Sequence, residues 1–100
     1  MRRISVSTAL FDGYPLEQAL DEIAAAGASY VEPALIHGYV EFTEAIFTNA
    51  TGARLAERMR AAGLSALAVS AHMDLGLPGA VDMLRRRLDL AGVIGAGILI

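Results

Sequence analysis

Hydrophobic and polar positions alternate along the chain with two periods, one typical of strands and one of helices. In residues 3–9 the apolar Ile4 and Val6 alternate with serines, and this period of two predicts a strand because successive side chains of a strand point to opposite faces. The segment from Pro15 to Gly27 instead repeats its apolar residues every three or four positions, which predicts an amphipathic helix. Its apolar stripe consists of Leu16, Ala19, Leu20, Ile23 and Ala24.

The same succession of a short apolar run and a helical spacing follows at once. A second strand is predicted over 29–34, and a longer segment, 37–50, is rich in glycine, threonine, asparagine and aromatic residues. Thr51 is the predicted N-cap of a second helix, and Gly63 is the glycine that ends it. The apolar stripe of this helix consists of Leu55, Ala56, Met59 and Ala62.

The stretch 63–74 predicts a third strand with two unlike faces. One parity carries Leu67, Val69 and Ala71, and the other carries Ala66, Ala68, Ser70 and His72. This pattern is typical of a parallel strand that packs on helices with one side and faces a barrel interior with the other. A third helix is predicted after a turn at 75–79, and residues 98–100 open a fourth strand. The predicted buried stripe of the third helix consists of Val81, Leu84, Leu88 and Ala91.

Three glycines mark a repeat in this pattern. Gly27, Gly63 and Gly97 each stand between a helix and a strand, at intervals of about 35 residues, which is the length of one strand-helix unit. Such units predict parallel strands, as in doubly wound sheets and (β/α)8 barrels. Small or polar residues on one parity of each strand favour the barrel, and residues 9–13 lack the glycine-rich turn of a dinucleotide site. The predicted fold class is therefore α/β of the (β/α)8 TIM-barrel type.

A complete barrel of this type needs about 250 residues, whereas the chain has 100. We therefore expect residues 1–100 to form the N-terminal half of a single barrel domain, with four strands and the three helices between them. The first and fourth strands would then be apolar edges. Because unpaired apolar edges favour association, we expect a homo-oligomer.

Charge and cysteine content narrow the function classes. Eight basic residues against 11 acidic ones give a net charge of −3, so nucleic acid is not an expected partner. The run from Arg85 to Arg87 is interpreted as a solvated helix face, with an anion or phosphate contact as the alternative. The absence of cysteine excludes disulfides, thiolate nucleophiles and cysteine-based zinc sites.

The apolar runs do not predict a membrane protein. The N-terminal residues lack the apolar core of a signal peptide. The longest apolar run, 91–100, is about half of the ~20 residues that a membrane helix needs. We expect a soluble, cytoplasmic protein with no membrane partner.

Two side chains are the main candidates for chemistry. Glu32 lies on the polar parity of the second strand, near its C-terminal end, where a buried carboxylate is costly unless it is paired or functional. His72 lies on the same parity at the end of the third strand, where barrel enzymes build their active sites. We interpret both as catalytic candidates and His72 also as a substrate contact. A structural ion pair or hydrogen bond inside the barrel is the alternative for the carboxylate, and a satisfied structural histidine is the alternative for His72.

Three further residues are weaker candidates. His37 lies in the segment after the second strand and is predicted to bind substrate, with a solvated loop histidine as the alternative. Phe11 follows the first strand and is predicted to wall the pocket, with plain packing as the alternative. Asp74 either orients His72 or serves as a turn residue before the third helix. No metal-ligand motif occurs among these residues.

The order of these segments resembles the N-terminal half of the xylose isomerase-like TIM-barrel superfamily. The segments that carry the resemblance are Ile4-Ser-Val-Ser-Thr, the helix from Pro15 to Ala-Gly27, Tyr30-Val-Glu32, Ala61-Ala-Gly-Leu and Ser70-Ala-His72. The resemblance covers almost the whole chain, and its motifs are moderately specific.

This resemblance implies an isomerase or epimerase of small sugars, sugar phosphates or polyols that transfers a proton next to a carbonyl through an enediolate. It implies a divalent metal (Mn, Mg, Co or Zn) whose ligands lie beyond Ile100, and it matches Glu32 and His72 to the early pattern of the family. The superfamily also includes apurinic endonucleases, which remain an alternative. A second alternative is an incomplete half-barrel that only self-associates.

Overall fold

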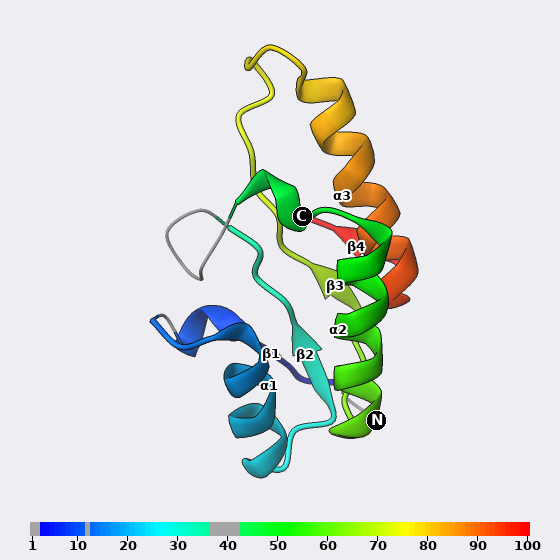
Figure 1. Cartoon of the computed structure of the whole chain (residues 1–100). Coiled ribbons are helices and arrows are strands. Elements are labelled where there is room, and N and C mark those ends of the chain that lie inside the picture. The colour runs from blue at the N-terminus through cyan, green and yellow to red at the C-terminus, as the bar shows by residue number, and fades with distance from the viewer. Residues whose placement is uncertain (1–2, 12, 37–42) are drawn as a thin grey trace.

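Strands and helices alternate along the whole chain (Figure 1). The computed structural model describes residues 3–11, 13–36 and 43–100. Its regular elements are β1 (Ser5–Ser7), the 3-10 helix η1 (Thr8–Phe11), α1 (Leu16–Ala25), β2 (Tyr30–Glu32), the 3-10 helix η2 (Glu44–Ile46), α2 (Asn49–Ala61), β3 (Ala68–Val69), α3 (Ala80–Ile94) and β4 (Ile98–Leu99). The chain is therefore an α/β unit, as the pattern predicts.

The strands are parallel and lie side by side in chain order. β1 pairs with β2 in parallel register, with Ser7 opposite Glu32. Two parallel bridges, Tyr30 to Ser65 and Ala34 to Ser70, join β2 to the segment that contains β3, and β3 pairs with β4. The strands are shorter than the expected runs, because regular pairing covers only two or three residues in each of them.

The core lies between one face of these strands and the helices. Val31 and Val69 are fully buried, and they belong to one apolar cluster with residues of all three helices. From the helices this cluster includes Leu20, Ile23, Leu55, Met59, Leu90, Ala91 and Ile94. The face of β4 that points away from this core is exposed to solvent, since Ile98 is 57% exposed.

The second helix begins earlier than predicted. Its N-cap is Thr48, whose hydroxyl oxygen accepts a hydrogen bond from the backbone N–H of Thr51 at 3.1 Å. Thr51 therefore stands in the first turn, so its assignment as the N-cap was wrong. Both threonines are good cap residues. The helix starts at the first of them because Thr48 is the one with an extended backbone.

Glycines end the helices. Gly27 and Gly63 follow α1 and α2 with φ angles of 91° and 74°, and these left-handed angles are open to glycine at little cost. α3 ends at Gly95, with φ of 91°. Gly97 stands between α3 and β4, as predicted, two residues after the glycine that ends the helix.

The third helix turns a different face to the core than predicted. Val81 is 70% exposed and Leu88 52% exposed, so two members of the predicted stripe face outward. The buried face instead carries Ala80, Arg87, Leu90, Ala91 and Ile94. None of the helices in the described ranges is long and apolar enough to span a membrane.

Candidate functional site

Glu32 and Ser70 meet across the two middle strands. The hydroxyl of Ser70 donates a hydrogen bond of 2.7 Å to Oε2 of Glu32. Glu32 is half-buried and is the last residue of β2, while Ser70 is buried and directly follows β3. The contact puts both residues on one face of the strands, which is the arrangement that the parity of the two predicted strands implies.

An irregular register brings these two side chains together. The segment 30–34 pairs with the segment 65–70, which is longer by one residue. An extra residue on one strand is a β-bulge, and it shifts the side chains that follow it onto the other parity. The bulge therefore sets which residues of 65–70 share a face with Glu32.

Only one oxygen of the Glu32 carboxylate has a partner among the described residues. Oε2 accepts from Ser70, and no hydrogen bond or ion pair to Oε1 is found in the described ranges. An ionised carboxylate accepts several hydrogen bonds. Ser70 thus orients the carboxylate through Oε2, and within the described part of the chain Oε1 has no partner.

His72 lies at the end of the next strand and lines a different part of the surface. It is exposed and borders an open apolar groove of about 320 Å³ together with Leu84, Ile100 and neighbouring residues. No hydrogen bond or ion pair connects His72 to Glu32 within the described part of the chain. The structure thus places the two candidates on consecutive strand ends without direct contact.

The structure places two of the three weaker candidates, Phe11 and Asp74. Phe11 is half-buried in η1, packs against the core and makes an edge-on contact with the ring of Tyr14 at 6.3 Å. Asp74 accepts the backbone N–H of Gly76 at 2.8 Å and so acts as a turn residue. His37 lies outside the described residues, and its predicted role stays a prediction.

A buried arginine next to His72 is the feature that the sequence pattern missed. Arg87 is 2% exposed, so its interpretation as part of a solvated face was wrong. Arg85, by contrast, is exposed as predicted. Helical spacing carried the missed signal, because Arg87 stands three, four and seven residues before the buried Leu90, Ala91 and Ile94.

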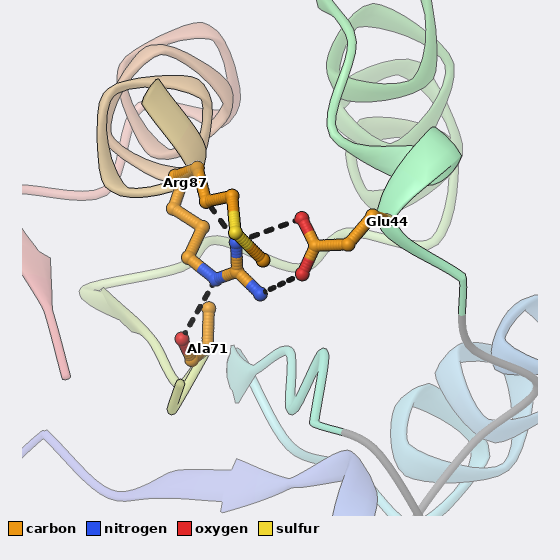
Figure 2. A network of polar contacts seen from close by, with 4 residues as sticks. Glu44, Ala71 and Arg87 are labelled. Atoms are coloured by element: carbon orange, nitrogen blue, oxygen red, sulfur yellow. Dashed lines mark hydrogen bonds and ion pairs between the residues drawn. The ribbon is translucent and has the colours of Figure 1, made fainter. Parts of the chain in front are cut away.

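Four hydrogen bonds surround the guanidinium of Arg87 (Figure 2), and an aromatic ring lies over it. Nη2 and Nη1 donate to the two carboxylate oxygens of Glu44 at 2.5 and 3.0 Å. Nε donates to the carbonyl of Ala71 at 3.0 Å, and Nη1 donates to the carbonyl of Met83 at 3.2 Å. The ring of Phe47 lies 4.2 Å from the guanidinium carbon. A bidentate, stacked arrangement of this kind is specific to arginine.

The 3-10 helix η2 explains how one short segment supplies both contacts. Glu44 and Phe47 are three residues apart, and side chains at this spacing lie above one another in a 3-10 turn. The carboxylate and the ring therefore approach Arg87 from the same segment. The network joins α3, the end of β3 and the segment that leads into α2.

The described residues do not assemble a metal centre by themselves. No three histidine, cysteine, aspartate or glutamate side chains gather in the described ranges. The resemblance implies a divalent metal whose ligands lie beyond Ile100, so its ligands are not expected among these residues. Comparisons with protein-family models, with curated proteins and with solved structures found no match to the chain.

Proposed function

We propose that this chain forms the first half of a (β/α)8 barrel and contributes substrate-binding residues to a sugar or sugar-phosphate isomerase or epimerase. The strand order supports the barrel, because β1 to β4 are parallel neighbours in chain order. In a doubly wound sheet the order reverses at a switch point near β1. In a barrel it does not reverse, and ligands bind at the C-terminal ends of the strands.

The observation that carries the function is the oriented carboxylate at such a strand end. Ser70 holds Glu32 by one oxygen, which leaves the other to accept a substrate hydroxyl or to take the proton next to a carbonyl. His72, on the following strand end, would donate to or accept from a second hydroxyl. The proposal keeps Phe11 as a wall and His37 as a further substrate contact. A divalent metal would polarise the carbonyl, with ligands outside these residues.

The edge strands favour a second candidate, a half-barrel that only self-associates. Ile4 beside β1 is 73% exposed, and Ile98 and Ile100 at the other edge are 57% and 53% exposed. Apolar side chains on unpaired edges promote pairing with another chain. The endonuclease alternative has less support, because a net charge of −3 suits neutral or metal-bound substrates better than a nucleic-acid backbone.

Thermal unfolding with and without ligands tests the proposal. A ligand at a hundredfold excess over its Kd stabilises the folded state by about 2.7 kcal/mol, which raises Tm by about 10–20 °C in a domain of this size. We expect D-fructose or D-fructose 6-phosphate to give such a shift. Glu32→Gln and His72→Ala should each reduce it, whereas the exposed helix variant Glu22→Gln should not.

Two outcomes of the thermal unfolding experiment would contradict the proposal. If neither of these sugars raises Tm, or if His72→Ala leaves the sugar-induced shift unchanged, the assignment is wrong. A sedimentation experiment on the same protein separates the second candidate, which predicts a concentration-dependent assembly and no response to either sugar.

A further inference from the structure

The contacts of Arg87 place a fixed donor on the peptide group that precedes His72. Nε of Arg87 donates to the carbonyl of Ala71 at 3.0 Å, and this contact is buried. The carbonyl of one residue and the N–H of the next belong to one planar peptide unit. Fixing the Ala71 carbonyl therefore fixes the direction of the His72 backbone N–H and the point from which the imidazole projects.

This contact lies next to the pairing of residues 69 and 71 with Ile100. The N–H of Ile100 donates to Val69 at 2.9 Å, and the N–H of Ala71 donates to Ile100 at 2.8 Å. The next group on this side of the strand is the Ala71 carbonyl, whose donor is Arg87. Arg87 therefore holds the carbonyl that precedes His72, a residue that is exposed.

Stability alone is a poor reason for this arrangement. Replacing a buried ion pair by apolar residues of similar volume is often neutral or stabilising, because desolvation of the charges offsets their attraction. The pair instead fixes the orientation of the guanidinium. Glu44 accepts hydrogen bonds from both terminal nitrogens of Arg87, and because the group is planar this also fixes the direction of its Nε–H bond. Phe47 fixes the plane of the group from one side.

We propose that Arg87 is a positioning residue for His72. It fixes the Ala71–His72 peptide and, through Glu44, ties this strand end to the segment that leads into α2. The consequence for sugar binding rests on the proposed function. The orientation of the peptide does not, and it can be measured without any ligand.

Lysine at position 87 separates the positioning role from the charge. A lysine ammonium reaches a carboxylate as a point charge, but it lacks the planar fork that serves Glu44 and Ala71 together. Arg86→Lys, one position earlier on α3 where the side chain is exposed, is the matched control. Glu44→Gln is the third variant, because its amide oxygen keeps one of the two hydrogen bonds that orient Arg87.

The readout is the backbone order parameter of the His72 amide by ¹⁵N NMR relaxation. In the wild type we expect the value of about 0.85 that marks a rigid backbone, and in Arg87→Lys a value falling towards the flexible range below about 0.6. The amides of Val69 and Ser70 should keep their rigidity, which shows that the strand itself is intact. Arg86→Lys should leave the His72 amide as in the wild type, whereas Glu44→Gln, which keeps one of the two bonds that orient Arg87, should loosen it less than Arg87→Lys does.

The second readout is the Kd for D-fructose 6-phosphate from chemical-shift titration. We expect Arg87→Lys to raise it about tenfold, the lower end of the loss found when an orienting partner is removed. If no sugar binds the wild type while the His72 amide still loosens in Arg87→Lys, the proposed function fails and the positioning role stands.

A rigid His72 amide in Arg87→Lys overturns the positioning role, and so does an equal loosening in Glu44→Gln or in Arg86→Lys. Should Arg87→Lys fail to fold, Arg87→Met takes its place with the same readouts. That variant carries no buried charge and still lacks the donor to Ala71.

Discussion

Replacing Glu44 by alanine leaves the guanidinium of Arg87 inside the protein without its carboxylate, at a site where that side chain is 2% exposed. Removing one partner of a fully buried pair costs about 3–5 kcal/mol, because the other charge stays desolvated. The Glu44 side chain is 37% exposed, so water reaches part of the vacated space. We therefore expect Glu44→Ala to lower the free energy of unfolding by about 3 kcal/mol.

The reverse replacement removes the buried charge itself. In Arg87→Met the partly exposed carboxylate of Glu44 turns to water, and the main loss is the donor to the buried carbonyl of Ala71. An unsatisfied buried acceptor costs about 1–3 kcal/mol. Arg87→Met should therefore destabilise the protein less than Glu44→Ala. The double variant should lie near Arg87→Met alone, because the loss of Glu44 then leaves no charge unpaired.

Urea unfolding followed by circular dichroism at 222 nm measures these differences. Glu57→Ala is the control, since Glu57 is 72% exposed and pairs with Arg60 one helical turn away, and such pairs contribute about 0–1 kcal/mol. The account of the network is refuted if Arg87→Met is the more damaging single variant. It is also refuted if the effects of the two single variants simply add in the double variant.

Two further predictions concern the ends of the helices. Thr48→Ala removes the hydroxyl that caps α2 and should lower the free energy of unfolding, measured in urea, by about 1 kcal/mol. The control is Thr43→Ala at the start of η2, where the side chain makes no cap bond, and it should lower this free energy less. Equal losses in the two variants would contradict the capping role. Gly63→Ala forces alanine into a φ of 74° with no atom within 4 Å of the new methyl group, so the expected loss of about 1–2 kcal/mol is purely conformational. Gly92→Ala lies in the exposed part of α3 and should instead raise Tm, by the helix propensity of alanine; the same sign for both alanine variants would show that the backbone argument is wrong.

Local patterns predicted the elements whose cause is local. The spacing of Leu20 and Ile23 determines which side of α1 is buried, and both residues are in the core. Gly27 and Gly63 end their helices because a left-handed residue is needed there. The N-cap of α2 was misplaced by one turn, because Thr48 and Thr51 are chemically equivalent as caps and only the backbone distinguishes them.

The buried face of the third helix could not be predicted from the local hydrophobic pattern. Two faces compete on α3, one with Val81 and Leu88 and one with Leu90 and Ile94, and the second face includes Arg87. Burying an arginine is costly unless a distant segment supplies a carboxylate. Glu44 does so across 43 positions of sequence, and no periodicity within the helix contains that information.

The candidate site also combines a feature that the sequence predicts with features that depend on tertiary structure. Parity puts Glu32 and Ser70 on one face, and the structure brings them into hydrogen-bond contact. The bulge that sets their register depends on how two strands pair, so the contact itself could not be predicted. The surroundings of His72 likewise depend on tertiary contacts, because the carbonyl of the preceding Ala71 accepts its hydrogen bond from Arg87 on α3.

Glu32 and His72 are proposed to belong to one sugar-binding site, and an NMR titration that follows both side chains together is the sharpest experiment on this proposal. D-fructose 6-phosphate, with Mg²⁺ present, would be added to protein labelled at the glutamate carboxyl carbons and the histidine ring. The account predicts that the Glu32 and His72 signals shift along the same binding curve, with one Kd. Signals that stay still, or that follow two different curves, would contradict it.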